Sequence, residues 1–427
     1  MRLTSLVGGV LVVQVVCAGL VVPGASAVTH ASSLPTLEPA PPSLVLPGAA
    51  CTPETTVYSP DVPLALERLN SDLAWQTATG RGVTVAVVDS GVAAGNAHLA
   101  GAVLPGVSLV DVPEADNAPT SDVWAHGTAV AGQIAARPVD GSGVVGLARD
   151  ATILPVRVYF ADDEQTNDAG NGPRDDRMAA GIRAAADAGA QIINVSMSTT
   201  VDSPDLRAAV EHATSLGSLV VASAGNRNTS EDKEDSPRYP AAYPEVLSVT
   251  SVDSAGQPTQ DAIHGPHIDV AAPGTDVLTT YLAAGDCLIG DGVPSPSYAT
   301  AYVSAAAALV AQTYPQESPA QWAHRLEVTA SRSTLDVKSY YTGWGTIRPS
   351  EALAFVDDGT ARGPDSPAFP RPPVPTEEPQ SLDLDQEIDP ILKTQDVAVW
   401  WALGGVGVVL ATVLLGRLVG GLRRTRR

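Results

Sequence analysis

The middle of the chain alternates two kinds of apolar segment. Short runs rich in β-branched residues predict buried strands, and Ala-rich stretches between them predict helices. Continuous apolar strands that alternate with helices indicate an α/β fold of three layers, with a mostly parallel central sheet covered on both faces. The expected strands are Val83–Val88, Ile153–Tyr159, Gln191–Val195, Leu219–Ala222, Val246–Val252 and Ile268–Ala271, and the expected helices are His126–Arg137, Arg174–Ala188, Asp205–Leu216 and Ser297–Tyr314.

This alternation extends over residues 64–356, and roughly 290 residues suit one large domain. Sites in open α/β sheets gather at the carboxyl ends of the strands, so the residues that follow each strand are the first candidates for function.

The first 27 residues have the pattern of a secretory signal peptide. Arg2 precedes an apolar run from Leu6 to Val22, and Ala25-Ser26-Ala27 offers a small-x-small cleavage site. An uncleaved anchor is the alternative, which the cleavage site disfavours. Residues 28–63 are Pro-rich and shorter than the ~50 residues of an independent domain, so we expect an N-terminal extension that lies along the main body.

A second apolar segment lies near the C-terminus. Residues 397–416 carry no charge, and at ~1.5 Å per residue they reach about 30 Å, the thickness of one hydrocarbon core. A basic tail follows at 417–427, and clustered arginines favour the cytoplasmic side. We therefore expect one membrane span with a cytoplasmic C-terminus. A buried core helix is the alternative, which the flanking arginines disfavour.

Proline and acidic residues dominate residues 357–396, between the domain and the span. We expect this segment to be an extended linker that reaches at most roughly 120 Å.

Charge and composition exclude several classes of protein. The 427 residues include 25 basic and 47 acidic side chains, a net charge of −22, and only 4% are aromatic. Nucleic acid is therefore excluded as a partner, because its phosphates need clustered cations and its bases need aromatic platforms. Without Arg2 and the five tail arginines the net charge is −28. We interpret this negative charge as an adaptation that keeps the protein soluble at a cell surface. A preference for basic substrates is the alternative.

Cysteine is scarce, with Cys17, Cys51 and Cys287 alone. Three cysteines exclude a disulfide-dense miniprotein and a four-cysteine zinc site. Cys17 lies in the signal peptide, so Cys51 and Cys287 are the thiols left in an oxidising compartment. They can form a disulfide if their Cα atoms lie within about 7 Å.

Two polar residues stand at the predicted edge of the sheet in the first half of the domain. Asp89 follows the strand VTVAVV, where a carboxylate is often a cap or a turn residue. His126 opens HGTAVAG and a helix, and Gly127 beside it permits close approach of the helix backbone. A single histidine is usually structural or solvated.

Asn226 and Ser297 occupy similar positions in the second half. Asn226 follows the strand LVVASA and is first of all a turn signal, but an amide there can donate to a developing oxyanion. Ser297 begins the most apolar long helix, where serine is most often an N-cap. The free N–H groups and the dipole of a helix start also stabilise an oxyanion.

In the order Asp89, His126, Asn226, Ser297, these residues resemble the subtilisin-like serine proteases (subtilases). The matching stretches VAVVDSGV, HGTAVAG, INVSM, VVASAGN and SYATAYVSAAAAL cover nearly all of residues 80–315. The resemblance implies a subtilisin-like fold and serine endopeptidase activity. His126 is then the general base for Ser297, Asp89 fixes its tautomer, and Asn226 with the Ser297 N–H forms the oxyanion hole.

The same resemblance implies a binding edge for an extended protein or peptide substrate. Ser196, Met197 and Ser198 would pair with the substrate main chain, and Ala224 and Gly225 would line the primary pocket. An ordinary buried strand end is the alternative, because the family's usual glycine after this segment is absent.

The signal peptide, the Cys-bearing extension, the Pro-rich linker and the C-terminal span are together similar to the mycosins. These are membrane-anchored subtilases that accompany type VII secretion systems. The resemblance implies processing of secreted proteins, an extension that wraps the catalytic domain, and secretion-complex subunits as partners. It implies no cofactor, and we expect no metal, because no Asp-rich loop requires one; we interpret Asp162-Asp163-Glu164 as a solvated turn.

The chain departs from the family just before the nucleophile. Ser295-Pro296 replaces Gly-Thr, and Ala301 replaces a proline. Pro296 leaves the Ser297 N–H in place but restricts Ser295, which costs more than glycine if the backbone needs a positive φ. A second hypothesis follows: a catalytically impaired subtilase that is a structural or stabilising subunit of the secretion complex. The family's usual cysteine before the histidine is also absent, so its disulfide pattern is not carried over.

Overall fold

The computed structural model describes residues 43–44, 51–113, 117–227, 233–290, 292, 294–370 and 390–424. The chain divides into two compact units, one up to Pro370 and one from Arg371. The predicted signal peptide, residues 1–27, lies outside the described residues.

A seven-stranded sheet forms the centre of the first unit, and each pair of neighbouring strands in it is parallel. Its order is β4-β5-β3-β6-β7-β8-β9, which confirms the predicted α/β fold with a mostly parallel sheet. Every expected strand lies within two residues of an observed one. The strands are β3 Thr84–Asp89, β4 Val107–Ser108, β5 Thr152–Arg157, β6 Ile192–Val195, β7 Leu219–Ser223, β8 Val246–Val252 and β9 Val270–Pro273.

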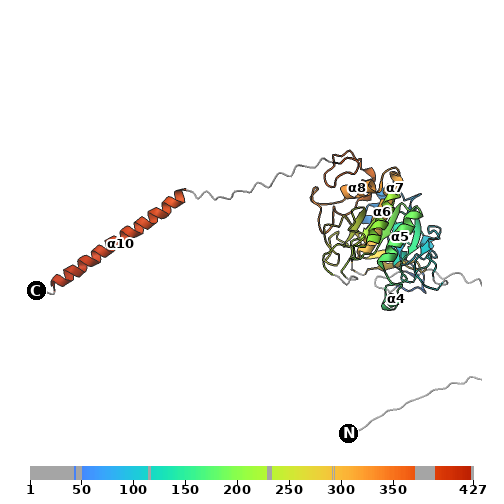
Figure 1. Cartoon of the computed structure of the whole chain (residues 1–427), viewed down its shortest axis with the longest axis horizontal. Helices are drawn as coiled ribbons and strands as arrows, with labels where there is room; N and C mark the ends of the chain where they lie inside the picture. Colours follow the sequence, from blue (N-terminus) through green and yellow to red (C-terminus); the bar gives the residue numbers. More distant parts are fainter. Residues whose placement is uncertain are drawn as a thin grey trace, which may run out of the picture. The chain divides into compact units, whose positions relative to one another are not determined.

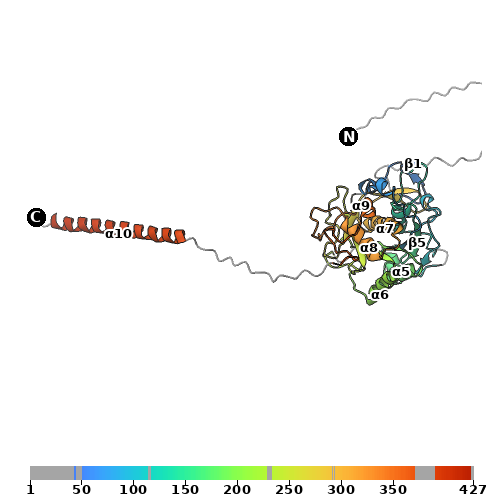
Figure 2. The ribbon, with the colours of Figure 1, turned by 90° about the horizontal axis from the view of Figure 1, so that it is seen from above.

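Helices cover both faces of this sheet and create two hydrophobic clusters (Figures 1 and 2). On one face the core residues of α5 (Asp175–Asp187) and α6 (Pro204–Ser215) pack on the strands. On the other face lie α3 (His126–Ala135) and α7 (Pro296–Thr313). α7 is buried along nearly its whole length, which explains why its sequence is apolar on all sides.

Shorter elements complete the first unit. α8 was not among the predicted helices, although Ser318 and Gln321 form a capping box at its start and Pro319 is its first residue. The helices are α1 Leu64–Arg68, α2 Ser71–Ala74, the 3₁₀ turn η1 Ala97–Leu99, α4 Glu164–Asp168, α8 Pro319–Val328 and α9 Pro349–Ala354, and the strand pairs are β1 Ser43–Leu44 with β2 Val57–Tyr58 and β10 Val277–Thr280 with β11 Asp286–Ile289.

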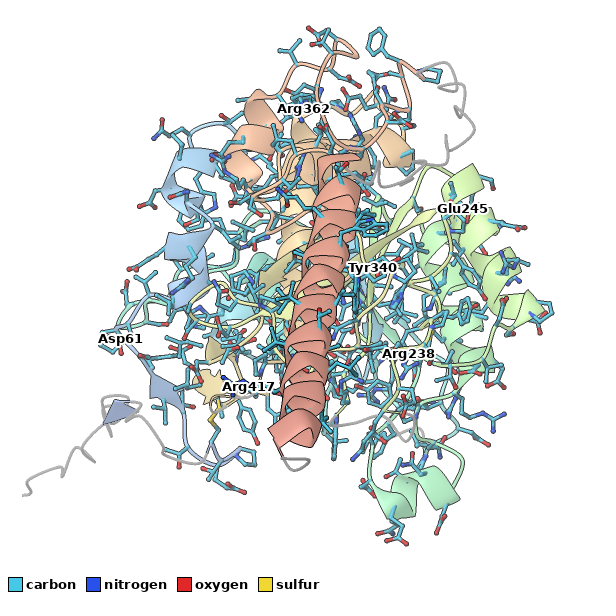
Figure 3. The ribbon with its side chains drawn as sticks, turned by 90° about the vertical axis from the view of Figure 1, so that its left-hand side faces the viewer. Asp61, Arg238, Glu245, Tyr340, Arg362 and Arg417 are labelled. Carbon is cyan, nitrogen blue, oxygen red and sulfur yellow. A yellow bond between two sulfur atoms is a disulfide. The ribbon has the colours of Figure 1, made fainter. Side chains whose placement is uncertain are left out.

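The described part of the N-terminal extension is bonded to the β10–β11 hairpin. A disulfide joins Cys51 to Cys287, with Cα atoms 5.9 Å apart; it is the yellow bond in Figure 3. The Ser59 N–H donates to Asp286 Oδ2 at 2.9 Å. The extension therefore has both a covalent and a polar attachment to the domain.

The second unit contains α10, Pro390–Arg424. Its segment Thr394–Leu418 is long and apolar enough to cross a membrane and is the single such helix in the described part of the chain. The expected linker, 357–396, differs from the structure at both ends. Residues 357–370 belong to the first unit, where Arg362 pairs with Asp336, and α10 already begins at Pro390.

Candidate active site

The connectivity of the sheet places a crevice at the carboxyl end of β3. Its neighbours are β5 on one side and β6 on the other, so the chain leaves this point in opposite directions. Ligand sites of open α/β sheets lie at such switch points. Asp89 is the last residue of β3 and is fully buried there.

His126 lies directly against Asp89. The imidazole Nδ1 is 2.8 Å from Asp89 Oδ1 and 2.9 Å from Oδ2. The His126 side chain is 19% exposed, whereas that of Asp89 is 0% exposed. Because an ionised carboxylate only accepts, Nδ1 carries the proton and Nε2 keeps its lone pair for the cavity. His126 can therefore take a proton from a group on its open side.

Gly127 lets helix α3 come this close to β3. A Cβ atom at Gly127 would lie 2.2 Å from the carbonyl oxygen of Gly91 and 3.1 Å from Asp89 Cβ. The Gly127 N–H instead donates to Ser90 Oγ at 3.0 Å. A side chain at this position would push His126 away from its carboxylate.

Asp122 organises the turn that starts α3. Its carboxylate accepts the N–H groups of Trp124 and Ala125 at 3.0 Å and that of Thr128 at 2.9 Å. Ala125 has φ 69°, a left-handed conformation that is costly for alanine and needs such support. Sequence reasoning did not identify Asp122, because an isolated aspartate before a helix has the appearance of an ordinary cap.

The environment of His126 shifts its basicity upward. Burial lowers the pKa of His126, but the charge of Asp89 and the hydrogen bond to it outweigh burial, so the pKa lies above 6.5. The Asp122 and Asp162 carboxylates act in the same direction.

Ser297 is the second residue of α7, so it is not the N-cap that its sequence position suggested. Ser295 is the cap residue and Pro296 is the first helical residue. Ser295 has φ −126° and ψ 120°, the extended conformation that a residue before proline prefers. No positive φ is required here, so serine in place of glycine adds no backbone strain.

Two hydrogen bonds tie Ser297 to Ser196, the residue that follows β6. Ser297 Oγ donates to the Ser196 carbonyl oxygen at 2.9 Å, and Ser196 Oγ donates to the Ser297 carbonyl oxygen at 2.8 Å. Asn194 Nδ2 donates to Ser196 Oγ at 2.9 Å. The nucleophile candidate is thus held by the strand that is expected to bind substrate.

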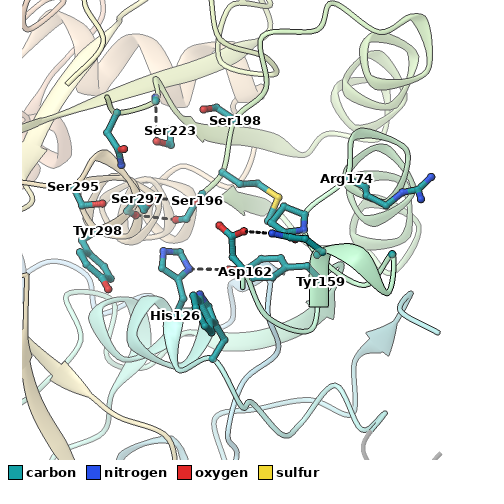
Figure 4. A pocket seen from close by; sticks show the side chains of 18 residues that line it. His126, Tyr159, Asp162, Arg174, Ser196, Ser198, Ser223, Ser295, Ser297 and Tyr298 are labelled. Atoms are coloured by element: carbon teal, nitrogen blue, oxygen red, sulfur yellow. Dashed lines mark hydrogen bonds between the residues drawn. The ribbon is translucent and has the colours of Figure 1, made fainter. Parts of the chain in front are cut away.

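One cavity of about 790 Å³ joins these residues (Figure 4). His126, Ser297 and Asn226 all line it, although they come from three separate elements. So do four of the five predicted substrate-binding residues, namely Ser196, Met197, Ser198 and Gly225.

Ala224 does not line this cavity. It is fully buried, and its N–H donates to the Val249 carbonyl oxygen at 2.8 Å, which continues the pairing of β7 with β8. The wall of the pocket at this point is formed by Ser223 and Gly225 instead.

The segment Asp162-Asp163-Glu164 is exposed, as expected for a solvated turn, but it also forms the start of α4. Asp163 caps α4 by accepting the Thr166 N–H at 2.9 Å, and Asp162 lines the cavity. Three aromatic residues of the cavity were not among the predicted site residues, because aromatic residues near the ends of strands and helices resemble core residues. They are Trp124, Tyr159 and Tyr298, whose ring centroid lies 5.6 Å from that of His126.

The fold and this site define a class of protein, and comparison with known proteins agrees. The chain matches the Subtilase family over residues 80–345 and belongs to that family. It is 35% identical to mycosin-1 of Mycolicibacterium smegmatis over 71% of this chain and 75% of the relative. It is 32% identical to mycosin-3 of Mycobacterium tuberculosis over 82% of this chain and 86% of the relative.

A solved structure gives the same result. The crystal structure of MycP1 from the ESX-1 type VII secretion system matches with a TM-score of 0.62 and 30% identity, over 76% of this chain and 91% of that one. Within the subtilases, the chain is a subtilisin-like serine protease of the mycosin type, which confirms the resemblance inferred from its motifs.

Proposed function

We propose that this protein is a membrane-anchored serine endopeptidase that cleaves secreted proteins at a type VII secretion system. The pairing of His126 Nδ1 with both oxygens of buried Asp89, on a cavity that also contains Ser297, carries this proposal. The similar protein MycP1 comes from the ESX-1 type VII secretion system, which supports the choice of substrate class.

The chemistry assigned to the site is acyl transfer. His126 Nε2 takes the proton of Ser297 as Oγ attacks the scissile carbonyl, and Asp89 stabilises the imidazolium. Asn226 and the Ser297 N–H hold the oxyanion, and His126 returns the proton to the leaving amine. Water then repeats the sequence on the acyl-enzyme.

The substrate itself prepares the nucleophile in this proposal. The Ser297 hydroxyl bonds to the Ser196 carbonyl, which is also the acceptor that an extended substrate would use for its own N–H. A bound substrate competes for that oxygen, so the hydroxyl turns about its Cα–Cβ bond toward His126. Exposure of the nucleophile thus depends on occupation of the binding edge.

The proposed location follows from α10 and the charges around it. Its apolar side chains are exposed, as a lipid-facing helix requires, and Arg417, Arg423 and Arg424 lie at its C-terminal end. We place the tail in the cytoplasm and the catalytic unit outside. A membrane-impermeant thiol reagent on intact cells tests this orientation: it should label a cysteine added at Asp187 and spare one added after Arg424.

Proteolysis by the full-length protein in detergent tests the function. Cleavage of an unfolded protein substrate is expected from wild type and lost in Ser297→Ala at equal expression and equal thermal stability. Equal cleavage by both proteins would show a contaminating protease and defeat the assignment.

One observation favours the second candidate function, a catalytically impaired subunit that stabilises a secretion complex. The Ser297 hydroxyl is bonded to Ser196, next to the altered Ser295-Pro296 segment. If that state persists with substrate, wild type and Ser297→Ala will be equally inactive, and deletion of the protein but not Ser297→Ala will reduce recovery of the intact complex from membranes.

A further inference from the structure

We propose that Tyr159 is a positioning residue for the Asp89–His126 pair: its phenol holds the Asp89 carboxylate in the orientation that His126 needs. The expected effect of Tyr159 on the rate rests on the proposed protease function, whereas its expected effect on the titration of His126 does not. In the sequence, Tyr159 is only the last residue of a predicted buried strand.

The contact is short and buried. Tyr159 lies two residues after the end of β5, and its hydroxyl donates to Asp89 Oδ1 at 2.9 Å. The phenol oxygen of Tyr159 lies 3.4 Å from His126 Nδ1. Tyr159 is 4% exposed and lines the cavity with His126, as Figure 4 shows.

The backbone around Asp89 brings the phenol to this place. The Val158 N–H donates to the Asp89 carbonyl oxygen at 2.9 Å, so the chain after β5 stays in register with the end of β3. Arg157, fully buried, donates from Nε to the Ser90 carbonyl oxygen at 2.9 Å. These contacts fix the main chain of Asp89 and Ser90 relative to Arg157 and Val158, the two residues just before Tyr159.

Asp89 Oδ1 therefore accepts three donors, while Oδ2 accepts one. The donors to Oδ1 are Tyr159 Oη, the Ser90 N–H at 2.7 Å and His126 Nδ1 at 2.8 Å. A carboxylate that accepts several fixed donors resists rotation about its Cβ–Cγ bond, so the imidazole that it holds is fixed as well. Burial, followed by the charge of Asp89, raises the pKa of Tyr159 well above 10, so the phenol remains a donor.

The phenol also affects the charge balance at His126. In Tyr159→Phe, Asp89 loses one group that stabilises its negative charge, and the buried carboxylate then attracts the imidazolium more strongly. The other charged or titratable groups facing His126 remain in place. They are Asp89 on β3, Asp122 before α3, Asp162 after β5 and Tyr298 on α7.

Tyr159→Phe in the full-length protein tests the proposal, with Tyr243→Phe as a matched control. Tyr243 is also buried, and its phenol donates to Asp202 Oδ1 at 3.0 Å, away from the cavity. We expect Tyr159→Phe to lower kcat roughly 10-fold with KM within about twofold, because one hydrogen bond to a charged group is lost. The acid limb of the kcat/KM profile should move to higher pH.

An NMR titration measures the same effect without turnover. In Ser297→Ala protein with ¹³C-labelled histidine, the His126 signal is identified by its loss in His126→Gln. Its midpoint should rise when Tyr159→Phe is added and stay fixed when Tyr243→Phe is added. A midpoint that is unchanged or lower with Tyr159→Phe would overturn the proposal. If wild type proves inactive the proposed protease function fails, whereas this titration still decides the role of Tyr159.

Discussion

The side chains of Ser297 and Ser196 each donate a hydrogen bond to the other residue's carbonyl oxygen, at 2.9 and 2.8 Å. The pair links the start of α7 to the end of β6. Further along the same network Ser304 Oγ donates to Asn194 Oδ1 at 2.8 Å. A buried network in which each group has a partner fixes geometry better than isolated contacts do. The position of Ser297, the proposed nucleophile, therefore depends on residues that have no proposed part in the reaction.

Ser196→Ala should reveal that dependence. It removes the bond to the Ser297 carbonyl and leaves Asn194 Nδ2 without this acceptor, so we expect kcat to fall about 10-fold. Ser218→Ala is the control, because Ser218 is equally buried and donates to the Ala190 carbonyl oxygen at 2.7 Å, away from the cavity. Steady-state kinetics on a peptide substrate separate the two variants. Equal rates in both would mean that the network has no catalytic role.

The raised pKa of His126 predicts the pH dependence of the enzyme. The general base must be neutral, so kcat/KM should rise with pH and reach half its maximum above 6.5, the ordinary value for histidine. An Asp89→Asn variant, which lacks the carboxylate charge, should lose the increase in the pKa of His126 and most of the activity. A profile of kcat/KM between pH 5 and 9 measures the midpoint, and a value below 6.5 would contradict the assigned environment.

Gly225 predicts a steric limit in the substrate pocket. A Cβ atom there would lie 2.9 Å from Arg238 Cγ and 3.0 Å from Ser198 Oγ. Gly225→Ala should therefore distort the pocket wall and raise KM. Gly217→Ala is a matched control, because Gly217 has a similar φ, 86° against 89°, with open space around its Cβ position. Both variants should lose stability, but Gly225→Ala alone should lose kcat/KM; equal kinetics would remove Gly225 from the binding site.

Glu327 predicts that stability declines as the pH rises from about 4.5 to about 8. Burial, followed by the charge of Asp269, raises the pKa of Glu327 to about 8 from an ordinary 4.5. Between these values the folded state holds a proton that the unfolded state has lost, so the free energy of unfolding falls as pH rises. Glu327→Gln should match wild type at pH 4.5 and unfold about 5 °C higher at pH 8.5. Thermal unfolding measures the difference in unfolding temperature between Glu327→Gln and wild type, with the exposed Glu211→Gln as control. A difference that does not increase with pH would refute the assigned role of Glu327.

The sequence was sufficient for the sheet and the main helices because their signals are local. The strands β3, β6, β7 and β8 are continuous apolar runs, and α3 and α7 are long Ala-rich segments, so burial and period agree. The helix α8 is mixed in polarity, and so are the strands of the β10–β11 hairpin, VLTT and DCLI, so neither stands out from its surroundings.

Contacts between segments that are far apart in the sequence could not be predicted from such local patterns. Asp89 and Tyr159 are 70 positions apart, and the phenol reaches the carboxylate only because β5 pairs with β3 in one register. The order of the motifs predicted the candidate catalytic residues, whereas the residues that position them could be recognised only from the packing of the folded chain.

Covalent labelling tests whether His126 and the proposed oxyanion hole activate Ser297. A fluorophosphonate reacts with a serine only when a neighbouring base and an oxyanion hole activate it. With the full-length protein, we expect a single adduct, which peptide mass spectrometry places on Ser297, and its loss in His126→Gln. Wild type that stays unlabelled, or an adduct on another residue, would show that Ser297 is not an activated nucleophile.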